Sequence, residues 1–358
     1  MQRTDIMARA NAFCDEFGLN VPILLAPMAG ACPVGLSAAV ATAGGMGACG
    51  ALLMSPDEIG DWARDLRSQT NGAFQMNLWI PDPAPERNAA REAQVREFLA
   101  QWGPVVPEYA GDAGLMDFDA QCEAILSAGP QVVSSIMGVY PPGFVARLKE
   151  RRIRWFANVT TVGEALEAEA AGADVIVAQG MEAGGHRGAF NADQAASHLV
   201  GLFSLLPAVA DAVKLPVVAT GGIADARGIA GALMLGASAV QIGTGLLRTP
   251  EAGIAPVWAD ALERARPEGT IATRAFSGRL GRSLRTAYAE AANAPDTPAP
   301  APYPVQRNLT APMRAAAAKA ANLDAMQVWA GQSAGLARPD PAGEVVAALW
   351  RETQDLLG

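Results

Sequence analysis

The feature that most constrains this chain is a regular alternation of short apolar runs with helical segments. Eight apolar runs have the pattern of buried strands: Pro22–Pro27, Gly47–Leu52, Ala73–Ile80, Val132–Met137, Arg154–Thr160, Ala173–Gln179, Pro216–Thr220 and Ala239–Gly243. Helical patterns follow seven of them, at Val34–Ala43, Pro56–Arg67, Glu86–Gln101, Pro142–Arg152, Glu164–Ala171, His198–Val213 and Ala226–Leu235. Because no antiparallel hairpin signal interrupts the series, the pattern predicts a closed parallel (β/α)₈ barrel, or TIM barrel. An open doubly wound sheet is the alternative.

The sequence changes character after the eighth strand. Pro295–Pro304 is rich in Ala and Pro and predicts an extended connection, and Ala311–Gln327 has a helical pattern. We therefore expect residues 1–249 to form the barrel and residues 250–334 to form a smaller inserted lid domain. Residues 335–358, with the helical pattern Glu344–Leu357, are expected to return to the barrel.

Composition excludes several classes of function. The net charge of −9 argues against partners such as nucleic acid or an anionic membrane surface, which both reward excess Lys and Arg. The uncharged stretch Val21–Met54 is broken by Pro and Gly, so it predicts buried strand and not a membrane helix. Four cysteines without CxxC spacing are typical of reduced thiols in a cytoplasmic protein. Two histidines without paired carboxylates predict no metal site.

One glycine motif is misleading. Gly45–Gly50 matches GxGxxG, the dinucleotide fingerprint, but that motif functions only between a strand and the helix that follows it. Here the glycines follow a predicted helix and lead into a strand. We interpret them as a tight turn before the second strand and predict no Rossmann site.

Two other glycine loops follow the last two predicted strands, at Thr220–Ile223 and Gln241–Gly245. In TIM barrels these two loops often bind phosphate through backbone N–H groups, and glycine lets the backbone approach the phosphate oxygens. A single such loop would be no more than a connection between strand and helix. Two in consecutive positions predict a phosphate site.

The segment Gln179–Gly188 is the most informative motif because it leaves a buried strand at the rim where barrel active sites lie. His186 stands between glycines and an arginine on this loop and predicts a base or hydrogen-bond donor that works near neutral pH. The second histidine, His198, lies near a helix start and is predicted to be a bystander. We expect Glu182 and Arg187 to be solvated loop charges.

Together, these segments resemble the nitronate monooxygenase family, once called 2-nitropropane dioxygenases. The resemblance runs from about residue 20 to the end of the chain, and Trp329–Gln332 is similar to a C-terminal motif of the class I branch. The segments that carry it are Pro22–Gly30, the strand that contains Asn77, Gln179–Gly188, Gly221–Ile223 and Gln241–Thr244. Members of this family are FMN-binding barrels with a smaller inserted domain.

The resemblance implies a role for each matching residue. His186 would be the catalytic residue, Met28 would lie against the flavin ring, and Asn77 would hydrogen-bond the cofactor. Glycines and polar residues at the last two strands would hold the phosphate of the FMN. The full set implied to bind FMN is Met28, Asn77, Gln179, Gly184, Gly221, Gly222, Gln241, Ile242, Gly243 and Thr244.

The implied reaction is the oxidation of an alkyl nitronate, such as propionate 3-nitronate, by O₂ through a flavin semiquinone to a carbonyl compound and nitrite. His186 would bond to the nitro oxygens or remove the α-proton of a neutral nitroalkane. The alternative within enzymes is an NADH-dependent FMN reductase that acts on a quinone or an enoyl thioester. A flavin-binding protein without turnover and a barrel for another phosphorylated metabolite are further alternatives. A homodimer is possible.

Overall fold

A closed barrel of eight parallel strands forms the centre of the molecule. The structure is a computed structural model that describes residues 3–358. The barrel strands are β1 (Ile23–Leu25), β2 (Gly47–Gly50), β3 (Phe74–Trp79), β4 (Val132–Ile136), β5 (Arg154–Val159), β6 (Val175–Gln179), β8 (Val217–Thr220) and β9 (Ala239–Ile242). Their order is β1-β9-β8-β6-β5-β4-β3-β2, and a parallel bridge between Leu24 and Met46 joins β1 to the start of β2. The predicted TIM barrel is confirmed.

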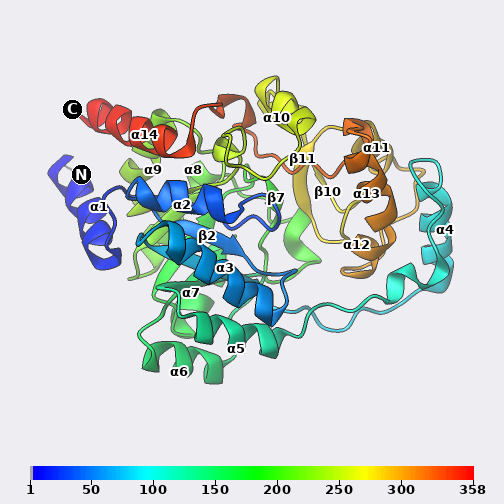
Figure 1. Cartoon of the computed structure of the whole chain (residues 1–358), viewed down its shortest axis with the longest axis horizontal. Coiled ribbons are helices and arrows are strands. Elements are labelled where there is room, and N and C mark those ends of the chain that lie inside the picture. Colours follow the sequence, from blue (N-terminus) through cyan, green and yellow to red (C-terminus); the bar gives the residue numbers. More distant parts are fainter. Residues whose placement is uncertain (1–2) are drawn as a thin grey trace.

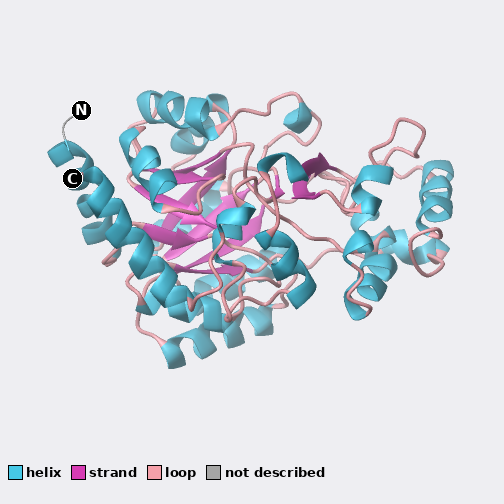
Figure 2. Ribbon diagram, turned by 90° about the horizontal axis from the view of Figure 1, so that it is seen from above, coloured by secondary structure: helices cyan, strands magenta, loops and turns pink. Residues whose placement is uncertain are grey.

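Helices surround the barrel, as Figure 2 shows from above. They are α2 (Val34–Thr42), α3 (Pro56–Gln69), α5 (Phe118–Ala128), α6 (Pro142–Glu150), α7 (Val162–Ala170), α8 (Leu202–Ala212), α9 (Ala226–Met234) and α14 (Ala342–Leu357). Local sequence sets their ends; in α3, for example, Ser55 and Glu58 form a capping box around Pro56. The C-terminal helix α14 packs against α9 and α2, so it fills the last place in the ring of helices.

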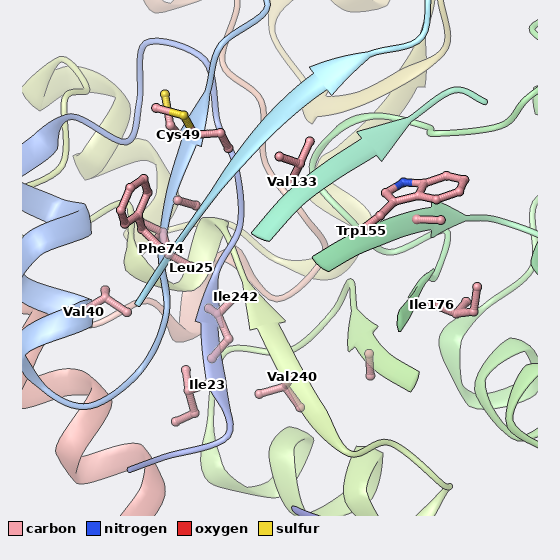
Figure 3. Packing of buried hydrophobic residues seen from close by; sticks show 14 of the residues in the cluster. Ile23, Leu25, Val40, Cys49, Phe74, Val133, Trp155, Ile176, Val240 and Ile242 are labelled. Carbon is pink, nitrogen blue, oxygen red and sulfur yellow. The ribbon is translucent and has the colours of Figure 1, made fainter. Parts of the chain in front are cut away.

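The core lies between the strands and these helices. Figure 3 shows part of it, in which Ile23 and Val240 from neighbouring strands and Val40 from α2 belong to one buried cluster. A separate cluster includes Phe156 of β5 and Phe13 and Phe17 of α1 (Arg3–Phe17). The ring of Phe17 meets that of Phe156 edge-on at 5.0 Å between centroids. Helix α1, which the sequence analysis did not predict, thus adds aromatic side chains to the barrel core.

A second, three-stranded sheet lies beside the barrel. Its order is β10 (Thr270–Thr273), β11 (Gly281–Leu284), β7 (Gly185–His186), and all pairs are antiparallel. No hairpin signal marks this region, because residues 274–280 separate β10 from β11 and form a connection far longer than a two-residue turn. This sheet positions the site, since β11 pairs Gly281 with His186.

A further hydrophobic cluster lies outside the barrel core and is called the second cluster below. It is built around Phe276, Leu309 and Met313. It draws on α10 (Pro256–Glu263), α11 (Ala287–Ala291), α12 (Val305–Leu309) and α13 (Ala311–Lys319). Of these, α11, α12 and α13 lie toward the end of the molecule away from the termini (Figure 1). The division at residues 249 and 334 stays a prediction.

Two predicted helices in this region are present but differ from the prediction in packing or in length. The helix predicted over Glu86–Gln101 is α4 (Ala89–Leu99), but its Val95 and Leu99 belong to the second cluster and not to the barrel core. Helix α5 packs beside α3 in the barrel instead. The helix predicted over Ala311–Gln327 ends at Lys319, where the chain turns into a short 3-10 segment. Within residues 3–358, no helix combines the length and the apolarity that crossing a membrane requires.

Candidate active site

A cavity of about 380 Å³ opens at the carboxyl ends of the barrel strands. The sequence-predicted residues that line it are Met28, Asn77, Gln179, Gly184, His186, Gly221, Gly222, Gln241, Gly243 and Thr244. The structure therefore brings together residues that are far apart in the sequence. Ile242 is the exception, because its side chain is 1% exposed and belongs to the barrel core.

Gln179, the last residue of β6, shapes the loop that carries His186. Its side-chain amide donates to the backbone oxygen of His186 at 3.1 Å, and its side-chain oxygen accepts the N–H of Gly188 at 2.8 Å. Both polar atoms of the amide thus hold the loop in a tight curve. Gln241 at the end of β9 is held similarly, since its oxygen accepts from Gln75 at 2.9 Å.

The prediction that Glu182 and Arg187 are solvated loop charges is wrong. The carboxylate of Glu182 accepts the backbone N–H of Leu202, the first residue of α8, at 2.9 and 3.0 Å. Carboxylates are favoured at helix N-termini by the exposed N–H groups there. Arg187 is only 6% exposed and donates to the backbone oxygens of Thr160 and His198, both at 3.2 Å. Both side chains therefore hold the loop in place through hydrogen bonds to backbone groups.

His186 is held by contacts on three sides. Its Nε2 lies 2.7 Å from the hydroxyl of Ser277. The rings of Trp79 and Trp329 meet the imidazole edge-on, with centroids 4.6 and 4.9 Å away. Strand β7 anchors the backbone of the same residue to β11. The imidazole therefore has a fixed position in the wall of the cavity.

The protonation of His186 follows from these neighbours. The hydroxyl of Ser277 lies within hydrogen-bond distance of both Nε2 of His186, at 2.7 Å, and the backbone oxygen of Arg279, at 3.2 Å. Nε2 is therefore engaged by Ser277, and Nδ1 is the ring nitrogen without a hydrogen-bond partner within residues 3–358. Burial, followed by the charges of Arg279, Arg307 and Arg314, lowers the pKa of His186 to about 3. The imidazole is accordingly neutral at pH 7.

Three glycines around the cavity are required by their backbone conformation or by a close contact. Gly221 and Gly222 have φ of +107° and +70°, a region that favours glycine. A Cβ on Gly184 would lie 2.5 Å from the backbone nitrogen of Gly331. That nitrogen donates to the hydroxyl of Thr244 at 3.0 Å, which joins the segment after Trp329 to the β9 loop.

Several lining residues were missed by the sequence analysis. Asn158, the residue before the last in β5, has a buried side-chain nitrogen without a hydrogen-bond partner among residues 3–358, and it lines the cavity. Trp258 of α10 also lines it, with its buried indole nitrogen unpartnered. Buried donors of this kind are normally satisfied, so they point to acceptor atoms on a ligand. The only signal for Asn158 in the sequence was a single polar amide within an apolar run predicted as a strand.

The electrostatic character of the cavity is opposite to that of the whole protein. Among the lining residues that the structure describes, Arg307 and Arg314 are the only Lys or Arg, and there is no Asp or Glu. A cationic cavity in a chain of net charge −9 favours an anionic ligand. Across residues 3–358, no three His, Cys, Asp or Glu side chains are grouped so that they could hold a metal ion. The four cysteines are buried and free.

The fold and the site together define a TIM-barrel protein with a cationic cavity at the carboxyl ends of its strands. Known proteins share both the sequence and this architecture. A nitronate monooxygenase from Paraburkholderia phytofirmans is 39% identical, over 95% of this chain and 94% of the relative. A probable nitronate monooxygenase from Staphylococcus aureus is 31% identical, over 98% and 99% of the two chains.

Solved structures agree with the sequence comparison. A nitroalkane oxidase from Streptomyces ansochromogenes superposes with a TM-score of 0.86 at 38% identity and covers 97% of this chain and all of its own. FabK from Thermotoga maritima gives 0.75 at 28% identity over 97% and 96%. The family model for nitronate monooxygenase matches residues 12–352. This chain belongs to the nitronate monooxygenase family, a family of oxidoreductases, and the resemblance seen in the sequence is confirmed.

Proposed function

We propose that this protein is an FMN-dependent nitronate monooxygenase that oxidises alkyl nitronates with O₂ to a carbonyl compound and nitrite. The observation that carries the proposal is the charge of the cavity, which is lined by two arginines and no carboxylate in a member of this family. A nitronate is an anion, so this electrostatic environment favours it over a neutral nitroalkane. We expect the protein to act in the cytoplasm, and a homodimer stays a prediction.

The residues of the cavity fit FMN. Gly221, Gly222 and Gly243 leave backbone space for phosphate oxygens at the ends of β8 and β9, and Thr244 adds a hydroxyl. The unpartnered nitrogen of Asn158 would donate to the flavin, and the side-chain oxygen of Asn77, whose nitrogen donates to Ser134, would accept from it, with Met28 against the ring. Gln179 and Gln241 line the same space, and Gly184 would present its backbone. When bound, FMN supplies the redox chemistry between substrate and O₂.

The protein's own residues bind and orient the substrate. Arg307 and Arg314 attract an anion, and Trp79 and Trp329 wall off water around His186. Because Nε2 of His186 is engaged by Ser277, Nδ1 would be the atom that accepts a proton from a neutral nitroalkane. A preformed nitronate needs no such step, and the low pKa of His186 makes it a weak base.

The second candidate function is the NADH-dependent reduction of a quinone or an enoyl thioester by the same cofactor. The observation in its favour is the fold, which the enoyl reductase domain of MlnA from Bacillus amyloliquefaciens shares with a TM-score of 0.67 at 14% identity. Identity this low supports the fold alone.

Anaerobic mixing separates the two functions. Purified flavin-loaded protein is mixed without O₂ either with NADH or with an alkyl nitronate, and the flavin absorbance is followed. We expect the nitronate to bleach the flavin much faster than NADH does. Rapid bleaching by NADH, with no response to the nitronate, would assign the reductase function instead.

A further inference from the structure

A polar side chain lies inside the barrel, one step deeper than the cavity. Gln75 and Asn77 are two residues apart on β3, so they share a face of the strand, but only Asn77 lines the cavity. Gln75 is 0% exposed, and its Oε1 has no hydrogen-bond partner among residues 3–358. A buried polar atom without a partner costs stability. The amide of Gln75 therefore needs an explanation other than packing.

The hydrogen bonds of Gln75 reach two other strands. Its Nε2 donates to the backbone oxygen of Leu25 on β1 at 3.2 Å and to Oε1 of Gln241 on β9 at 2.9 Å. A carbonyl oxygen only accepts hydrogen bonds, so the NH₂ end of Gln75 has to face Leu25. Because the same nitrogen contacts Gln241, that side chain has to present its oxygen to Gln75. One backbone oxygen thus sets the orientation of two amides in succession.

The consequence for Gln241 is a free NH₂ group. Its Nε2 makes no hydrogen bond within residues 3–358, and its side chain lines the cavity. Asn77 shows the contrast, because its nitrogen donates to the backbone oxygen and the hydroxyl of Ser134 at 3.2 and 3.1 Å, which leaves its oxygen for a ligand. Gln241 therefore offers a donor to the cavity where Asn77 offers an acceptor.

Without Gln75, the amide of Gln241 would lose its fixed orientation. The last torsion of a glutamine side chain is broad and roughly two-fold, so both orientations of a free amide are accessible. The backbone of Gln241 is held separately, since its oxygen accepts from the hydroxyl of Thr220 at 2.9 Å. A change at Gln75 should therefore redirect the side-chain amide of Gln241 and leave strand β9 in place.

We propose that Gln75 is a positioning residue that holds Gln241 so that its NH₂ group donates to an acceptor atom of bound FMN. Gln75 does not line the cavity, so it acts on the cofactor only through Gln241. The inference rests on the FMN dependence in the proposed function. It assigns a role to a residue outside the set that the resemblance implies.

The test measures how fast FMN leaves the loaded protein, followed by the fluorescence of the released flavin after dilution, without substrate. Gln75→Met and Gln241→Met each remove the amide and keep a similar volume. We expect either change to speed the release about 2- to 10-fold, the scale of one neutral hydrogen bond. The matched control is Gln306→Met, since this buried glutamine donates to the backbone oxygen of Ala275 outside the cavity. It should leave the release rate unchanged.

The double variant decides between positioning and an independent structural role. If Gln75 acts through Gln241, Gln75→Met should not speed the release further in protein that already carries Gln241→Met. Effects of the two changes that multiply would overturn the inference, because Gln75 would then affect the flavin by another route. A wild-type release rate in either single variant would overturn it as well.

A second substitution keeps the test decisive if Gln75→Met does not fold. Gln75→Glu retains the shape of the side chain, but its oxygens cannot donate to both Leu25 and Gln241, and they accept the NH₂ group of Gln241 instead. We expect the same faster release of FMN, and a wild-type rate in this variant contradicts the inference. Wild-type protein that cannot be loaded with FMN would refute the proposed function and this inference with it. Loaded protein with unchanged release in the variants refutes the inference alone.

Discussion

Replacing His186 by alanine tests how the site handles protons. The substitution removes the imidazole that contacts Ser277, Trp79 and Trp329 and leaves the glycine loops after β8 and β9 untouched. We therefore expect the variant to fold and to retain its flavin. What should fall is turnover.

The size of the loss depends on the substrate. For neutral nitroalkanes, loss of a general base costs about 10²–10⁴ in rate. Because the pKa of His186 is lowered to about 3, the imidazole is a weak base, and we expect the lower half of that range. Preformed nitronates need no proton removed, so their loss should be smaller and should reflect only the altered wall of the cavity.

The assay measures initial rates of O₂ consumption with a nitroalkane and with its own nitronate at the same pH. His198→Ala is the matched control, since His198 is exposed and outside the cavity. Near-normal rates of His186→Ala with both substrates would refute the catalytic assignment. Equal losses with both would show that His186 holds the anion and does not take its proton.

Three further outcomes follow from the site. Heat-released flavin should run as FMN in chromatography because we propose that the two glycine loops hold a single phosphate group, and a dominant FAD peak would contradict this assignment. Gly222→Leu and Gly243→Leu should lower the flavin content of the purified protein, the first also by strain at φ +70°; full occupancy in both would place the phosphate elsewhere. Because the pKa of His186 lies near 3 and the neutral form persists above it, kcat with a preformed nitronate should show no ionisation between about pH 5.5 and 8. A transition near pH 6.5 that His186→Ala abolishes would contradict the environment described for this residue.

The barrel could be predicted from the sequence because its strands are buried on both faces and read as apolar runs. The sequence-based prediction failed for segments whose packing or pairing partners are distant in the sequence. Helix α4 has no marked apolar face, and nothing local shows that Val95 and Leu99 pack in the second cluster. Strand β7 has two residues, too few for a periodic signal, and it exists because β11 pairs with it.

The residues of the site also divide into those that a local sequence pattern predicts and those that depend on distant contacts. Glycine loops could be located from sequence because their backbone requirement is local. Ser277, Arg307 and Arg314 could not, because they reach the cavity from the region after the barrel and carry no motif that marks their direction. Arg187 was misjudged for a related reason: its acceptors are backbone oxygens, which no sequence pattern reveals.

The most direct test of the central claim is the stoichiometry of one reaction. The flavin-loaded protein is incubated with an alkyl nitronate in an oxygen electrode, without NADH, and nitrite and carbonyl product are measured at the end. Rapid O₂ uptake with one nitrite formed per nitronate consumed is the predicted result. No O₂ uptake with any alkyl nitronate, in protein that holds its full flavin content, would contradict the proposed function.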